Sequence, residues 1–213
     1  MRIDRIVPII LTLALLLTAT WALAYEEVDD LVDIFTADRH FQAVVDGRRH
    51  FTEMYRLNEI IHWQGAKGEV GAFLTNERLL AVSTRSGQWN IQQLKVSEKK
   101  RVPDVLLASH LVVMLTDERA IGFGVHTGGF VQVRLPIGEA VVAQAARGRV
   151  AGIATSLRAF GFSSTRRGVA EIRFKRYERV ESIDATYNKV TLRTSQRLMI
   201  LNASDAVWRQ FNL

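Results

Sequence analysis

The chain has 213 residues, and 28 lysines and arginines against 22 aspartates and glutamates give it a formal net charge of +6. It contains no cysteine, which excludes disulfides, thiolate metal ligands and a lipid attached through a thiol. The basic residues are spread along the sequence rather than clustered. We therefore expect no nucleic-acid partner, whereas contact with an anionic surface stays open.

The first 24 residues have the pattern of a cleaved secretory signal peptide. Two arginines within Met1–Arg5 precede the apolar run Ile6–Ala19, and Ala22-Leu23-Ala24 offers a small-x-small cleavage site before Tyr25. A membrane anchor is the alternative, but the apolar run is short for a span of about 20 residues. We expect a periplasmic or secreted protein whose mature part, residues 25–213, is one domain without a transmembrane span.

A threonine recurs at a nearly fixed period along the mature sequence. The successive spacings are 39, 41, 39 and 39 residues, and an arginine follows each threonine three residues later. The threonines are Thr36, Thr75, Thr116, Thr155 and Thr194, and the arginines are Arg39, Arg78, Arg119, Arg158 and Arg197. A period near 40 is typical of repeat architectures, in which each unit packs on its neighbours.

The last repeat predicts four short strands separated by polar turns. Val180–Ala185 is rich in β-forming residues, and Val190–Thr194 alternates apolar and polar residues. Arg197–Leu201 is almost continuously apolar, as in a strand buried on both faces. Val207–Leu213 alternates again. The earlier repeats follow the same pattern, with turns before the second strand at Asp29-Asp30, Gly68-Glu69, Ser109-His110 and Gly148-Arg149.

Four antiparallel strands in about 40 residues, repeated radially, make a blade of a β-propeller, so the sequence predicts an all-β, five-bladed propeller. A β-trefoil would have three units, and an outer-membrane barrel would need strict alternation and aromatic girdles. Only Glu139–Arg147 could also pass for a helix. The first blade needs Tyr25–Val28 as its inner strand, and the wheel must close between this segment and the C-terminal strand. In period and strand pattern the mature chain resembles small bacterial and tachylectin-like propellers, without the signature of one family.

A glutamate recurs 23 residues after the threonine, in the loop before each inner strand: Glu59, Glu98, Glu139 and Glu178. The only change of repeat length falls just after Glu98, where Lys99-Lys100-Arg101 replaces one residue. The glutamates and the periodic arginines should crown one rim of the wheel. A charged ring that binds a polymer is one interpretation. We favour ion pairs repeated within or between the blades, with the threonine hydroxyl capping the backbone of a tight turn.

Large residues recur 14 positions after the threonine, at Trp89, Phe130 and Trp208. They could be platforms for sugars, but packing between adjacent blades is the preferred interpretation. The same position is Val169 in the fourth repeat, which weakens the case for a lectin with repeated sites.

Catalytic and metal-binding patterns are missing from the sequence. The five histidines fall at five different repeat positions, without a metal-ligand spacing such as HExxH, so we expect no metal and no cofactor. A small glycosidase would need facing carboxylates, for which Asp104, Glu181 and Asp184 are candidates. Long loops that would shape a cleft are absent, so we do not expect an enzyme.

The inner strands diverge where they begin, and these residues should lie at the mouth of the central channel. The candidate ligand-binding residues there are His62, Trp63, Asp104 and Glu181. The neighbouring Lys99-Lys100-Arg101 would attract an acidic partner. The sequence therefore favours an exported, non-enzymatic module that binds a protein or an envelope glycan, with a lectin and a glycosidase as alternatives.

Overall fold

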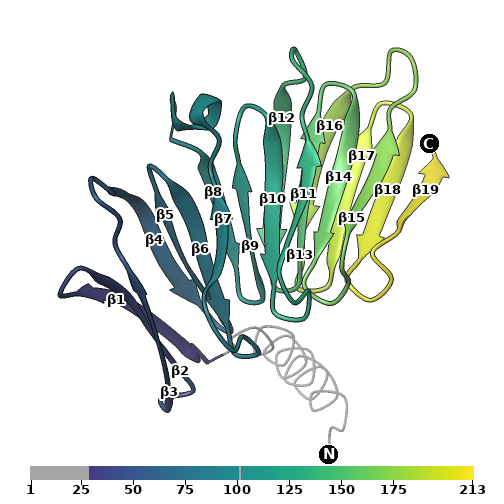
Figure 1. The fold of residues 1–213 in the computed structure, drawn as a ribbon. Helices are drawn as coiled ribbons and strands as arrows, with labels where there is room; N and C mark the ends of the chain where they lie inside the picture. Colours follow the sequence, from purple (N-terminus) through teal and green to yellow (C-terminus); the bar gives the residue numbers. More distant parts are fainter. Residues whose placement is uncertain (1–28, 101) are drawn as a thin grey trace, which may run out of the picture.

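The structure, a computed structural model, describes residues 29–100 and 102–213, without the side chains of Lys99 and Lys100. Within them, 19 strands form five antiparallel sheets, here called blades 1 to 5, which follow one another in chain order (Figure 1). The expected signal peptide and the segment Tyr25–Val28 lie outside the described residues. No helix in the described part is long and apolar enough to cross a membrane.

Blade 1 has three strands and blades 2 and 3 have four each. Blade 1 contains β1 (Val32–Ala37), β2 (His40–Val45) and β3 (Arg49–Met54). Blade 2 contains β4 (Ile61–Lys67), β5 (Val70–Thr75), β6 (Arg78–Ser83) and β7 (Asn90–Gln93). The 3-10 helix η1 (Val96–Lys100) leads to blade 3, which contains β8 (Asp104–Ala108), β9 (Leu111–Leu115), β10 (Arg119–Gly124) and β11 (Phe130–Arg134).

Blades 4 and 5 are also four-stranded. Blade 4 contains β12 (Val141–Arg147), β13 (Val150–Thr155), β14 (Arg158–Ser163) and β15 (Val169–Arg173). Blade 5 contains β16 (Val180–Ala185), β17 (Lys189–Thr194), β18 (Arg197–Asn202) and β19 (Trp208–Asn212). The four strands predicted for the last repeat are confirmed to within about one residue at each end. The helix-like segment Glu139–Arg147 contains the strand β12, in which Ala143 and Ala146 pack against the core while Val141 and Val142 are exposed.

The middle strands of blades 2, 3 and 4 are buried on both faces, which explains their continuous apolar runs. Every residue of β5, β6, β9, β10 and β13 is buried, and only the first residue of β14 is partly accessible. In β2 and β18, by contrast, buried and half-buried residues alternate. Blades 1 and 5 therefore each cover one face on a neighbour, and within residues 29–213 no blade packs on their other face.

Each blade is joined to the next by a backbone hydrogen bond between the turns that precede β1, β5, β9, β13 and β17. The four bonds run from Leu31 N to Gly68 O, from Glu69 N to Ser109 O, from His110 N to Gly148 O and from Arg149 N to Tyr187 O, at 2.7–3.0 Å. Among the described residues no such bond joins blade 5 to blade 1, which lie at opposite ends of the row in Figure 1. The blades thus form an open arc instead of the expected closed wheel.

Blade 1 differs from the other repeats by a shift of one residue. The threonine and arginine of the later repeats face each other across a two-residue turn, but in blade 1 Ala37 pairs with His40. Arg39 consequently lies in the turn itself, exposed and with a φ of 65°. The expectation that Thr36 and Arg39 are equivalent to the threonine and arginine of the later repeats is therefore wrong. In the structure, Ala37 and His40 occupy those two positions.

Candidate functional site

The periodic threonine, arginine and glutamate form one hydrogen-bonded unit in each of blades 2 to 5, which we call the arginine clasp. In blade 5, Thr194 Oγ1 accepts hydrogen bonds from the backbone N–H groups of Gln196 and Arg197 and donates to Glu178 Oε1 at 2.6 Å. Arg197 Nε and Nη2 donate to the two oxygens of the same carboxylate at 2.9 and 2.6 Å. The threonine thus fixes the tight turn and the arginine closes it through its planar fork.

The other clasps repeat this geometry. The shortest arginine–glutamate distances are 2.8 Å for Arg78–Glu59, 2.6 Å for Arg119–Glu98 and 2.9 Å for Arg158–Glu139. The expected arginine–glutamate ion pairs are therefore present, and each lies within one blade. Arg78 also pairs with Glu53 of blade 1, at 2.6 Å. Because the glutamate carboxylates are almost completely shielded from solvent and occupied by these donors, they have little capacity left for a ligand.

Each clasp also ties its blade to the preceding one. Nη2 of the arginine donates to a carbonyl at the end of the last strand of the preceding blade, at 2.6–3.0 Å. The four carbonyls stand 18 residues after the threonine, and they belong to Met54, Gln93, Arg134 and Arg173. Four arginines of the predicted rim, Arg78, Arg119, Arg158 and Arg197, therefore hold adjacent blades together.

The surroundings of the glutamates hold them ionised. Burial alone would raise the pKa of Glu178, but hydrogen bonds from Arg197, Thr194 and the Lys175 N–H outweigh it and lower the pKa to about 2. Against the same opposing effect of burial, the pKa values of Glu59, Glu98 and Glu139 are lowered too. In blade 4 the residue equivalent to Lys175 is Pro136, which has no N–H to donate.

The large residues 14 positions after the threonine pack in the core between the blades, which confirms the preferred interpretation. Trp89 contacts Phe73 and is 6% exposed, and Trp208 is 8% exposed. Trp208 Nε1 donates at 3.4 Å to the carbonyl of Ala170 in the preceding blade. Neither ring face is free to stack on a sugar.

The inner strands begin with a β-bulge in blades 2, 4 and 5. The extra residue of the bulge is His62, Val142 or Glu181, and the equivalent position in blade 3 is Pro103. A bulge residue has no partner in the strand ladder, so a proline is tolerated there, and bulges often redirect side chains beside functional sites. Two of the predicted channel-mouth residues, His62 and Glu181, are bulge residues.

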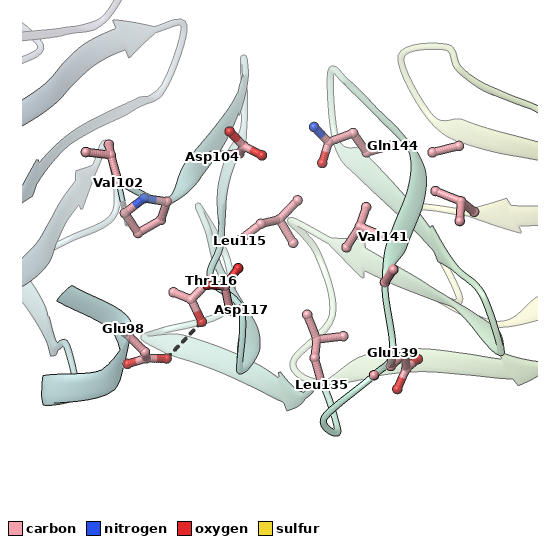
Figure 2. A pocket seen from close by; sticks show the side chains of 15 residues that line it. Glu98, Val102, Asp104, Leu115, Thr116, Asp117, Leu135, Glu139, Val141 and Gln144 are labelled. Carbon is pink, nitrogen blue, oxygen red and sulfur yellow. Dashed lines mark hydrogen bonds between the residues drawn. The ribbon is translucent and has the colours of Figure 1, made fainter. Parts of the chain in front are cut away.

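A cavity of about 560 Å³ lies between the inner strands of blades 3 and 4, at the rim that carries the clasps. Its apolar lining includes Leu115, Leu135 and Val141. Figure 2 shows Asp104 of β8 and Gln144 of β12 on opposite sides of the opening, with Leu115 and Val141 between them. The preceding loop contains η1 and the two extra residues of the repeat, so the single length change of the sequence lies beside this cavity.

The structure brings only one of the four predicted binding residues to the cavity. Asp104 lines it, whereas His62 and Trp63 lie on β4 and Glu181 lies on β16. Trp63 is half-buried against the core, and Glu181 forms an exposed ion pair with Arg193 at 2.9 Å. The side chains of Lys99, Lys100 and Arg101 lie outside the described part of the chain, while the described charges that line the cavity are acidic.

The sequence analysis missed a buried polar network in the turns that precede β5, β9, β13 and β17, at the end of the blades away from the clasps. His110 is 5% exposed, and its Nδ1 lies 3.2 Å from Glu69 Oε2 while its Nε2 bonds to the hydroxyl of Tyr187. The Arg149 guanidinium lies 5.6 Å from the centre of the Tyr187 ring. Burial lowers the pKa of His110 and outweighs the opposing effect of Glu69. Glu69, His110 and Arg149 share one repeat position, and these recurring polar residues in successive turns could have indicated the network from the sequence.

No group of three or more histidine, aspartate or glutamate side chains in the described ranges is arranged to hold a metal ion. The buried carboxylates of the clasps are instead neutralised by arginines. What the rim offers chemically is an apolar cavity with acidic and amide groups at its opening.

Comparisons with known proteins return neither a family model nor a curated protein that matches the sequence. Among solved structures, the chain is 8% identical to Prp20p from Saccharomyces cerevisiae, with a TM-score of 0.40, over 83% of this chain and 57% of that one. For AztD from Citrobacter koseri the identity is 12% and the TM-score 0.37, over 85% and 59%. For the WD40 domain of SCAP from fission yeast they are 9% and 0.36, over 86% and 52%.

The chain thus spans less than two thirds of the length of these structures. Its class follows from its own five antiparallel sheets, which pack face to face in chain order. It is a repeat protein of the β-propeller class.

Proposed function

We propose that this protein is an exported, non-enzymatic propeller that binds a segment of a partner protein in the cell envelope, at the cavity between blades 3 and 4. The observation that carries the proposal is the cavity itself. It lies where the repeat has gained two residues, and the exposed Asp104 stands in blade 3 at the position that is Trp63, Ala143 or Ser182 in the other blades.

The lining indicates what would bind. Leu115, Leu135 and Val141 offer an apolar surface for one side chain, and Asp104 at the opening is exposed and can accept hydrogen bonds from a cation. A peptide with an apolar anchor next to a lysine or arginine fits this combination. Export rests on the signal peptide expected from residues 1–24.

Selection from a random peptide library displayed on phage tests the proposal, because it samples many candidate segments at once. We expect the enriched peptides to combine Leu, Ile, Val or Phe with a neighbouring Lys or Arg. Binding should fall at least tenfold in Asp104→Lys, because the substitution replaces the carboxylate by an ammonium group that repels the lysine or arginine of the peptide. Asp184→Lys, which makes the same reversal on the inner strand of blade 5, is the matched control and should bind normally. If no peptide is enriched, or if Asp104→Lys binds as tightly as the control, the proposal is wrong.

A further inference from the structure

The arc ends in two blade faces that have no neighbouring blade among the described residues, whereas inside the arc such faces meet in the contacts between adjacent blades, here called seams. The open face of blade 1 carries Asp33, Phe35, Gln42 and Val44, because these residues alternate with the buried Val32, Phe41, Ala43 and Val45. The open face of blade 5 carries the apolar Leu198, Ile200 and Phe211. It also carries Lys189, Thr191, Arg193 and Arg209, and all of these alternate with or pair beside the buried Val190, Met199 and Leu201.

The two ends hold complementary halves of the hydrogen-bonded links that join the blades. Each of the four internal seams has one such backbone hydrogen bond, and in each blade the donor and the acceptor are consecutive residues. In blade 3, for example, His110 N donates to the next blade, and Ser109 O accepts from the preceding blade. By this rule Asn188 N is the next donor and Asp30 O is the matching acceptor. Among the described residues neither group takes part in such a link.

The hydrogen bond from the clasp arginine to the preceding blade also has an unused acceptor at one end of the arc and a possible donor at the other. The carbonyls that receive the arginines stand at Met54, Gln93, Arg134 and Arg173, and the next residue in this series is Asn212 on β19. At the other end of the arc, His40 occupies the position of the clasp arginine. The C-terminal face thus presents an acceptor and the N-terminal face a donor-bearing side chain.

The internal seams also predict which side chains would meet. Gly122 of blade 3 lies against Phe162 of blade 4, and Gly161 of blade 4 lies against Leu201 of blade 5. In both seams, the residue six positions after the threonine of one blade contacts the residue seven positions after the threonine of the next blade. Applied to the open ends, and corrected for the one-residue shift of blade 1, this relationship pairs Ile200 with Val44. Both are apolar and half-buried. Lys189 and Asp33 add opposite charges to the two faces.

We propose that the open face of blade 5 binds the open face of blade 1 in a second copy of this chain. Each copy would contribute one face of each kind, so a two-fold axis along the channel closes the assembly into a ring with two such seams and no open face. The partner is a second copy because the required links, donor to acceptor and apolar side chain to apolar side chain, are those of the seams inside one chain.

Sedimentation velocity of the protein produced from the full sequence tests the assembly. We expect a species with the mass of two chains, and we expect Ile200→Asp to shift it to one chain while its far-ultraviolet circular dichroism stays that of a β protein. Ile91→Asp, the same change at a partly exposed isoleucine of blade 2, should remain a dimer. A monomer at all concentrations of the unmodified protein would overturn the proposal.

Crosslinking gives an answer that does not depend on the folding of Ile200→Asp. Because the chain has no cysteine, Val44→Cys in one preparation can be oxidised with Ile200→Cys in another. We expect a disulfide between the two chains, because the proposed seam places residues 44 and 200 in contact. Its formation would show that their Cα atoms come within about 4.4–6.8 Å of each other. When both substitutions are placed in one chain, the product should again be a covalent dimer. A disulfide within one chain would show that the arc closes on itself, and it would overturn the proposal, as would the absence of any disulfide.

Discussion

Arg197 Nη2 lies 2.6 Å from Glu178 Oε2, and both side chains are almost completely buried. The same pairing recurs in blades 2, 3 and 4, and each time the arginine also reaches a carbonyl of the preceding blade. One side chain thus closes a turn, neutralises a carboxylate and joins two sheets. This relationship explains why the threonine, the arginine and the glutamate recur together at a period near 40.

The clasp should contribute to stability. Arg158→Ala leaves the Glu139 carboxylate without its cation and removes the link to Arg134 O, so we expect the free energy of unfolding to fall by about 3 kcal/mol. Thermal unfolding followed by circular dichroism should show a lower Tm. Arg173→Ala is the matched control, because that side chain is 86% exposed, and its Tm should stay unchanged. Equal melting of the two variants would contradict the structural role.

Acid should weaken the clasps. The pKa of Glu178 is about 2 in the folded chain against an ordinary value of 4.5. The folded state therefore binds fewer protons, and the stabilisation present above pH 4.5 is lost as the pH falls towards 2. Urea unfolding at pH 6 and at pH 3 should show this loss. Glu178→Gln should be less stable at pH 6 but less sensitive to pH, and an equal pH dependence in both proteins would be inconsistent with the account.

His110 should add a second pH dependence in a higher range. Burial lowers its pKa below 6.5, so the unfolded chain takes up a proton first and stability is lost as the pH falls through 6.5. Glu69, Tyr187, Arg149 and His126 are the titratable groups around it. We expect His110→Gln to lose less stability than the unmodified protein between pH 7.5 and 5.5. The prediction fails if His110→Gln loses as much stability over this range as the unmodified protein.

A pair of glycine substitutions separates backbone strain from contact between the blades. Gly148 and Gly128 both have a positive φ, of 54° and 66°. A Cβ at Gly148 would lie 2.6 Å from Tyr187 Cα, whereas a Cβ at Gly128 would meet nothing within 4 Å. We expect Gly148→Ala to lose about 1–3 kcal/mol more than Gly128→Ala in urea unfolding, because the turn of blade 5 must move. Equal losses would mean that the seam tolerates the side chain.

Much of the fold could be predicted from the sequence, because the period and the strand pattern are local. The alternation in Val190–Thr194 and the apolar run in Arg197–Leu201 place strands correctly, and the repeated spacing of Arg158 and Glu139 predicts their ion pair. These features depend on neighbours within one repeat.

The rest depends on relationships between repeats. The one-residue shift that puts Arg39 into a turn is invisible in a gapless alignment, because the loop before β3 absorbs it. The open ends of the arc depend on how the blades are inclined to one another. Of the predicted binding residues only Asp104 reaches the cavity, because the cavity lies between blades 3 and 4, whereas His62 lies on blade 2 and Glu181 on blade 5.

The central claim is that the periodic residues build the propeller while the diverged residues at blades 3 and 4 bind. Fluorescence anisotropy with a labelled peptide from the phage selection tests both halves, in Asp104→Lys and in Arg197→Ala held below its Tm. The account predicts that Asp104→Lys loses at least tenfold in affinity with an unchanged Tm, and that Arg197→Ala keeps its affinity within about twofold although its Tm is lowered. Unchanged affinity in Asp104→Lys together with lost affinity in folded Arg197→Ala would contradict it.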